Sequence, residues 1–276
     1  MITEILNKVA DLSSSCDQVT EDIIVARFKI VNAVLIGNVN SINKEWVLID
    51  TGLESSGKEI IEIAEKYYGK GNKPKCIILT HGHFDHIGSV IYLSELWQVD
   101  VYAHKLEMPF LTGKEDYPKG DPSVDEGLVA KMSQYFPNEA IDLGDKVKML
   151  PEDGSVPNLP EWRWVHTPGH TPGHISLFRQ RDRALIVGDA FTTLKQESLS
   201  SVLTQNKDVS GPPAYLTTDW ENAKNSVKVL ANLKPEIIVP SHGSTMSKKE
   251  IEPYLEEMVK NFDEEVVPKK GKFVEQ

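Results

Sequence analysis

Three histidines and one aspartate lie close together in the stretch Thr80-His81-Gly82-His83-Phe84-Asp85-His86-Ile87-Gly88. Imidazole nitrogens and carboxylate oxygens, used without cysteine, suit zinc, iron or manganese. His81 and His83 are two residues apart, so in an extended loop their side chains can point the same way. The pattern therefore predicts a metal site. The structural alternative is that Asp85 is the N-cap of a following helix, where it accepts free backbone N–H groups.

The residues on either side of this motif predict how it is positioned. Residues 76–79 are apolar and indicate a short buried strand. Residues 86–97 carry apolar side chains at roughly helical spacing, which predicts a helix. The motif is therefore expected in a strand-to-helix loop, where scaffolds commonly carry their chemistry.

The pattern His-x-His-x-Asp-His resembles the signature of the metallo-β-lactamase superfamily. The resemblance covers most of the chain. It implies the superfamily's α/β fold, a four-layer αββα sandwich of two mixed β-sheets flanked by helices. It also implies one domain over residues 1–276, with a core of about 22–262. The residue pattern alone predicts only mixed α and β structure.

Later landmarks extend the resemblance and complete a ligand set. His170 stands in Pro-Gly-His-Thr, and Asp189 and His242 each follow a predicted strand. By resemblance one metal is held by His81, His83 and His170, the other by Asp85, His86 and His242, with Asp189 shared between them. The resemblance also implies that Asp50, in Asp-Thr-Gly, supports the site without binding metal, as carboxylates beside ligand histidines do. The alternative for Asp50 is a turn-forming residue before glycine.

The segment that contains His170 repeats Thr-Pro-Gly-His, so His174 is a formal rival for the ligand position. Only His170 has the Pro-Gly-His-Thr context next to the strand end. His166 and His174 are therefore expected beside the site, as supporting or packing residues. His104 has no special context and is expected to be structural.

The resemblance implies two divalent metal ions, with zinc preferred over iron or manganese. Such metals lower the pKa of bound water from 15.7 toward about 7 and polarise the scissile carbonyl or phosphoryl oxygen. Asp85 is the candidate catalytic residue, because it could take the proton of the nucleophile and pass it to the leaving group. The chain is thus expected to be a hydrolase that uses a metal-bound hydroxide.

Departures from individual branches of the superfamily narrow the range of expected substrates. Gly188-Asp189 is not followed by the cysteine ligand of the commonest zinc β-lactamases, and the cysteine-bearing segment of glyoxalase II enzymes is absent. Phe191 and Thr192 stand where acyl-homoserine lactonases carry a tyrosine. A small ester, thioester or lactone is the expected substrate. The alternatives are a phosphodiesterase and a mononuclear iron oxidoreductase resembling persulfide dioxygenases.

Composition limits the partners. The chain has 276 residues and a formal net charge of −11, which disfavours nucleic acid and anionic membranes as partners. Two cysteines form no CxxC pair, and no secretory signal or membrane-spanning stretch is visible, so a cytoplasmic location is expected. The predicted partner is a small-molecule substrate, and the oligomeric state is not predicted.

The remaining pattern predicts strands and helices in alternation, with two irregular stretches. Helices are expected at 55–68, 128–136, 222–233 and 248–262, and strands at 23–30, 33–36, 45–50, 75–80, 99–102, 147–150, 162–165, 175–178, 184–187 and 236–240. The strands between 147 and 187 are expected to pair antiparallel. Residues 110–128 and 191–220 could lie over the site, and the alternative for both is ordinary connecting structure. Residues 1–20 predict only a frayed start or a short helix.

Overall fold

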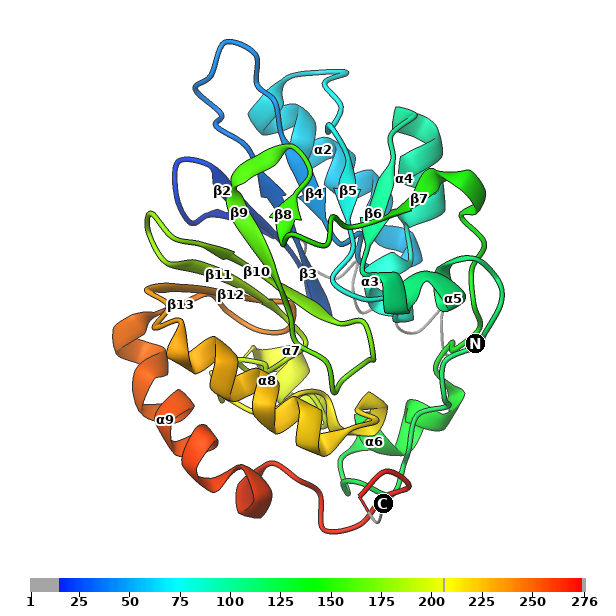
Figure 1. Cartoon of the computed structure of the whole chain (residues 1–276), viewed down its shortest axis with the longest axis vertical. Helices are drawn as coiled ribbons and strands as arrows, with labels where there is room; N and C mark the ends of the chain where they lie inside the picture. The colour runs from blue at the N-terminus through cyan, green and yellow to red at the C-terminus, as the bar shows by residue number, and fades with distance from the viewer. Residues whose placement is uncertain (1–14, 206, 275–276) are drawn as a thin grey trace. The chain divides into compact units, whose positions relative to one another are not determined.

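The computed structural model describes residues 15–205 and 207–274, which form two compact units (Figure 1). The first unit comprises Met1–Tyr117 and Glu139–Pro160, described from Ser15 onward. The second comprises Pro118–Asn138 and Glu161–Gln276, described to Val274 except for residue 206. Each unit contains a mixed β-sheet with helices.

The first unit is built on a seven-stranded sheet in the order β1-β2-β3-β4-β5-β6-β7. The strands β1 to β4 pair antiparallel, and β4 to β7 pair parallel. Their bounds are β1 Ser15–Gln18, β2 Ile23–Phe28, β3 Val31–Ile36, β4 Val47–Ile49, β5 Ile77–Ile78, β6 Val101–Ala103 and β7 Val147–Met149. Because β4 and β5 are parallel neighbours, their carboxyl ends lie at the same edge of the sheet.

The helices of the first unit are α2 (Gly57–Tyr68), α3 (Phe84–Ile87), α4 (Val90–Trp97) and α5 (Met108–Leu111). Helix α2 buries Ile60, Ile63 and Ala64 at helical spacing. The helix ends before Gly69, because the φ of 98° at this residue is incompatible with a right-handed α-helix. The single helix predicted over 86–97 is wrong, because the chain breaks between α3 and α4. At the break, a Cβ on Gly88 would lie 2.4 Å from backbone atoms of Leu53 and Glu54.

The second sheet has the order β13-β12-β11-β10-β9-β8. Strands β11 and β12 are parallel, and β9, β10 and β11 pair antiparallel, as do β12 and β13. The bounds are β8 Ser155–Val156, β9 Leu159–His166, β10 Ile175–Arg179, β11 Ala184–Gly188, β12 Ile237–Pro240 and β13 Met246–Ser247. The carboxyl ends of β11 and β12 therefore share one edge.

Helices of the second unit are α6 (Leu128–Met132), α7 (Leu199–Thr204), α8 (Trp220–Asn232) and α9 (Lys248–Glu265). Figure 1 shows α8 and α9 side by side along the sheet. A capping box of Ser247 and Glu250 begins α9, which then buries Ile251, Leu255, Met258 and Phe262. These side chains share a core with α8 and with Leu185, Val187 and Ile238 of the sheet. Truncating a residue such as Phe262 to alanine would cost about 3–5 kcal/mol.

Most predicted elements are present, with two further corrections. The segment 147–150 was expected in an antiparallel set, but β7 pairs parallel with β6 in the first sheet. The segment Ser15–Gln18 is a strand and not part of a helix, while the rest of the expectation for residues 1–20 falls largely outside the described residues. Two mixed sheets with flanking helices agree with the predicted fold class. Within the described part of the chain, no helix is long and apolar enough to cross a membrane.

Candidate metal centre

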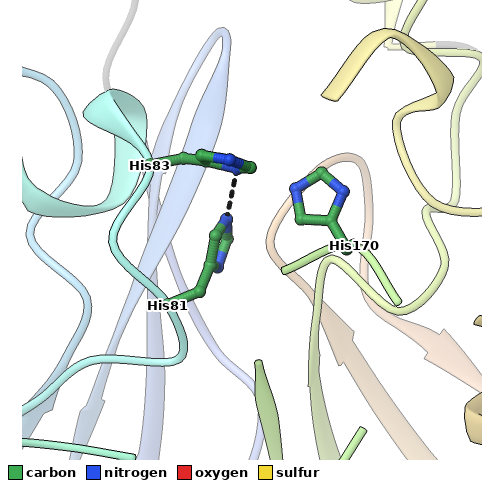
Figure 2. A group of neighbouring side chains, drawn as sticks. All are labelled: His81, His83 and His170. Atoms are coloured by element: carbon green, nitrogen blue, oxygen red, sulfur yellow. Dashed lines mark hydrogen bonds between the residues drawn. The ribbon is translucent and has the colours of Figure 1, made fainter. Parts of the chain in front are cut away.

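The first unit brings His81, His83, Asp85 and His86 together just after β5. All four side chains are buried. His81 Nε2 lies 3.0 Å from His83 Nδ1, a contact drawn as a dashed line in Figure 2. His86 Nε2 lies 3.9 Å from Asp85 Oδ1. The N-cap of α3 is His83, so the alternative role of Asp85 as N-cap is wrong; Asp85 lies within the first turn of that helix.

Asp50 lies behind these histidines, at the carboxyl end of β4. Its Oδ1 accepts the Thr80 N–H at 2.8 Å, and its Oδ2 accepts the Thr80 hydroxyl at 2.7 Å. His86 Nδ1 lies 2.8 Å from the same Oδ2. Asp50 has a φ of 57°, a conformation uncommon for residues other than glycine and enriched in asparagine and aspartate. The residue is thus held in a special backbone geometry that aims its carboxylate at the histidine loop.

These contacts assign the tautomers of two histidines. A carboxylate only accepts, so His86 must donate from Nδ1 to Asp50, which leaves a lone pair on Nε2. The Thr80 hydroxyl spends its proton on Asp50, so at 3.1 Å it accepts from His81 Nδ1. The lone pair of His81 is therefore also on Nε2. One carboxylate fixes His86 directly and His81 through Thr80, a common arrangement behind metal-binding histidines.

Two residues that the sequence did not single out hold the middle of the motif. The Gly82 N–H is 2.9 Å from Glu107 Oε2 and 3.1 Å from the Tyr117 hydroxyl, which itself donates to Glu107. The ring of Tyr117 packs on His83 with 4.6 Å between centroids. Burial, with the Glu107 carboxylate beside it, raises the pKa of Tyr117 well above its usual value, so the hydroxyl stays protonated. Tyr117 belongs to the irregular stretch 110–128, which therefore contacts the His81–His83 loop in this unit.

The second unit brings His170, Asp189 and His242 together. Asp189 follows β11 and His242 follows β12, the parallel neighbours. His170, which is labelled in Figure 2, lies in the turn between β9 and β10. Asp189 Oδ2 is 3.3 Å from His170 Nε2 and 3.2 Å from His242 Nε2. All three side chains are at most 2% exposed. One carboxylate oxygen of Asp189 thus faces the Nε2 atom of each of two buried imidazoles.

Residues of the segment 191–220 hold the turns that carry these histidines. The Thr217 hydroxyl donates to the Pro213 carbonyl at 2.9 Å, so it accepts from His170 Nδ1 at 3.1 Å and leaves the lone pair on Nε2. The Thr193 N–H donates to the His242 carbonyl at 3.1 Å. Gly243 has a φ of 100°, and a Cβ there would lie 2.3 Å from the Thr193 hydroxyl. The segment therefore supports the turns that carry the predicted ligands of this unit.

The large side chains of that segment do not form an open apolar surface. Phe191, Leu194, Tyr215 and Trp220 are buried within the second unit, and Leu203 is exposed. Lys195 Nζ is 3.3 Å from Asp125 Oδ2. Both Lys195 and Asp125 line a pocket of about 850 Å³ whose lining, among the described residues, includes none of the predicted ligands.

The remaining histidines have structural partners. His104 caps a short 3₁₀ helix by accepting the Leu106 N–H, and His166 Nε2 is 2.9 Å from the Pro172 carbonyl. His174 Nε2 accepts the Asp189 N–H at 2.8 Å. That nitrogen is thereby engaged with the backbone of a predicted ligand.

The donor sets of both units fit a metal ion. With nitrogen and oxygen ligands at 2.0–2.1 Å from zinc, neighbouring ligands of a tetrahedral site are about 3.3 Å apart. The observed separations of 3.0, 3.3 and 3.2 Å match this spacing within each unit. The tautomers of His81, His86 and His170 all leave a lone pair on Nε2. Buried imidazoles and carboxylates arranged in this way could hold divalent metals.

Comparison with known proteins identifies the family. A model of the metallo-beta-lactamase superfamily matches residues 26–242. The chain belongs to this superfamily. It is 51% identical over 213 residues to the "Probable metallo-hydrolase YflN" of Bacillus subtilis (strain 168), covering 77% of this chain and 81% of that protein. It is also 25% identical over 171 residues to the "Hydroxyacylglutathione hydrolase GloC" of Haemophilus influenzae, covering 55% of this chain and 74% of that protein.

A solved structure supports the fold. The metallo-β-lactamase of Cronobacter sakazakii matches with a TM-score of 0.63 at 16% identity, covering 94% of this chain and 96% of that one. The predicted family and fold class are therefore confirmed. Family membership together with the buried histidine and aspartate groups makes the protein a metallo-hydrolase, as predicted from the sequence.

Proposed function

We propose that the protein hydrolyses a small ester, thioester or lactone with two divalent metal ions, preferably zinc. His81, His83 and His170 would hold one ion, Asp85, His86 and His242 the other, and Asp189 would be shared. The observation that carries the proposal is the approach of both His170 Nε2 and His242 Nε2 to one oxygen of Asp189. A carboxylate in that position suits a bridge between two cations.

Residues of this chain would orient the metal ligands and move the proton during the reaction. Bound divalent metals would supply a nucleophilic hydroxide near neutral pH and a Lewis acid for the oxygen under attack. Asp50, Thr80 and Thr217 hold the ligand tautomers before any ion binds, which lowers the reorganisation needed on binding. Asp85 would take the proton of the nucleophile and deliver it to the leaving group.

The choice of a carbonyl substrate is supported by charge and by likeness. A chain of net charge −11 attracts polyanions such as nucleic acids poorly, which disfavours phosphodiesters of that kind. The GloC relative is named for the hydrolysis of a thioester, a carbonyl compound.

A substrate panel tests the proposal. Esters, thioesters, lactones and phosphodiesters would be offered to metal-loaded wild type and to the Asp85→Asn variant. That variant keeps the side-chain shape and removes the carboxylate that is both the proposed base and a proposed ligand, so the metal content of both proteins would be measured beside the turnover. Turnover of carbonyl compounds that falls in the variant is expected. Turnover of phosphodiesters alone would refute the carbonyl assignment.

Metal analysis tests the cofactor and the oxidoreductase alternative. Protein purified without added metal is expected to hold two divalent ions per chain and to consume no oxygen. One iron per chain with oxygen uptake would contradict the hydrolase proposal. A small-molecule partner and a cytoplasmic location remain predictions from the sequence.

A further inference from the structure

We propose that His174 is the positioning residue for Asp189. It acts through a series of hydrogen bonds around Gly188 in which each donor and acceptor role fixes the next. This inference rests on the proposed role of Asp189 as a shared ligand. The series begins at the Asp189 N–H, which donates to His174 Nε2 at 2.8 Å. His174 itself is fully buried, with 0% of its surface exposed.

The direction of each bond follows from the one before it. Since His174 Nε2 accepts, its proton is on Nδ1, which lies 2.8 Å from the Thr167 hydroxyl and 3.0 Å from the Thr167 carbonyl. The Thr167 hydroxyl lies 3.1 Å from the Ser176 hydroxyl, which donates to the Val187 carbonyl at 2.7 Å. Because the Ser176 proton is committed to Val187, Thr167 donates to Ser176 at 3.1 Å in preference to its longer contact of 3.5 Å with the His174 carbonyl, and the series of hydrogen bonds ends on Val187.

The two ends of this series lie on either side of Gly188. The Val187 carbonyl and the Asp189 N–H are thus both held, and Gly188 between them has a φ of 63°. A Cβ on Gly188 would lie 2.4 Å from His174 Nε2, so the ring packs directly against the turn. The β-strand pairing also shifts register between Ile186 and Gly188, which interrupts the regular β-ladder just before the turn.

The consequence is a fixed direction for the Asp189 side chain. Its Oδ2 can stay 3.3 Å from His170 and 3.2 Å from His242 only if the backbone that carries it does not rotate. The second Thr-Pro-Gly-His therefore supplies a support where the first supplies a ligand. Its imidazole is used as an acceptor for backbone and not as a metal donor.

Two substitutions of His174 separate the roles of its two ring nitrogens. In His174→Gln the side-chain amide oxygen can reach the position of Nε2 and accept the Asp189 N–H. In His174→Asn the amide reaches only the position of Nδ1, so the contact with Thr167 is kept and the acceptor for Asp189 is lost. The two variants are otherwise comparable in polarity.

The first measurement is metal affinity, obtained by competition with a chromophoric chelator using Zn²⁺ alone. Loss of support behind a ligand typically weakens binding about 10–100-fold, so His174→Asn is expected to fall in that range and His174→Gln to stay near wild type. The second measurement, on metal-free protein, is amide hydrogen exchange at Asp189, expected to be faster in His174→Asn only.

The outcomes are distinguishable. Equal loss in both variants, in parallel with their thermal unfolding temperatures, would show that His174 only fills space and would overturn the proposal. Loss of one whole metal equivalent in both variants would make His174 a ligand and also overturn it. Failure of the hydrolase assignment would leave the hydrogen-exchange result unchanged, because that measurement needs neither metal nor substrate.

Discussion

The substitution Asp50→Asn should reverse the proton positions of two predicted metal ligands, His81 and His86, without changing the shape of the site. Asparagine tolerates the positive φ of 57° at this position. Its amide oxygen can still accept the Thr80 N–H in place of Oδ1. Its NH₂ group, however, replaces the Oδ2 atom that accepts from the Thr80 hydroxyl and from His86 Nδ1.

The reversal propagates along the contacts. An NH₂ group beside His86 favours a lone pair on Nδ1, which moves the imidazole proton to Nε2. The Thr80 hydroxyl, now an acceptor from the amide, turns its proton toward His81 Nδ1 at 3.1 Å and moves that imidazole's proton to Nε2 as well. Two ligand nitrogens lose their available lone pairs, so affinity should fall toward the upper part of the about 10–100-fold range. A 100-fold loss corresponds to about 2.8 kcal/mol.

Zn²⁺ affinity by chelator competition measures the effect, and Thr80→Val is the matched control. That variant keeps the Asp50–His86 contact and removes the hydroxyl that joins Asp50 to His81, so its affinity should fall about tenfold. Nitrogen chemical shifts of the histidines in metal-free protein report the tautomers directly. An Asp50→Asn protein that binds Zn²⁺ like wild type, or that keeps the His86 proton on Nδ1, would refute the reasoning.

Three further predictions concern the site and the fold. His242→Ala should reduce the metal count by elemental analysis from two per chain to one, and an unchanged count would contradict its role. Tyr117→Phe should lower the free energy of unfolding by about 1–3 kcal/mol, because the buried Glu107 side chain and the Gly82 N–H lose a hydrogen-bond partner. The control is Tyr135→Phe, at a side chain that is 65% exposed, where the free energy of unfolding should change little. Contacts with Lys207 and Ser247 lower the pKa of Glu250 from 4.5 to about 2. Its ionised form therefore stabilises α9 above pH 4.5, and the stability gap between wild type and Glu250→Gln should close as the pH falls toward about 2 in denaturant titrations; a gap that persists there would show a packing effect.

The sequence predicted the elements best where side-chain periodicity and turn residues agreed. Helix α2 has buried residues at helical spacing and a glycine at its end, and the prediction of 55–68 differs from it by two residues. The pairing of β7 could not be predicted, because a three-residue strand has no pattern that separates parallel from antiparallel neighbours. The break between α3 and α4 depends on the close approach of Gly88 to Leu53, a contact between distant parts of the chain.

The candidate ligands could be named from sequence because several stand in short motifs, whereas their supports stand alone. Thr217 is 47 residues from His170, and Tyr117 is 35 residues from Gly82. A single threonine or tyrosine in an irregular segment carries no local signal of such a role. What the sequence could offer was the unusual length of 110–128 and 191–220 without clear periodicity, and both segments do contribute contacts to ligand-bearing loops.

The supports follow one physical rule in both units. Behind His81 and His170 stands a threonine hydroxyl whose own proton is already committed, to the Asp50 carboxylate in one unit and to the Pro213 carbonyl in the other. A hydroxyl that has given its proton away can only accept, so the imidazole must donate to it and must leave its other nitrogen as a lone pair. A threonine alone would leave the tautomer open, because its hydroxyl could rotate to either role. The choice of tautomer therefore comes from the acceptor behind the threonine. In the first unit that acceptor is a side chain, so substitution of Asp50 should alter metal affinity without touching a predicted ligand. In the second unit it is the backbone carbonyl of Pro213, so the equivalent substitution is at Thr217 itself.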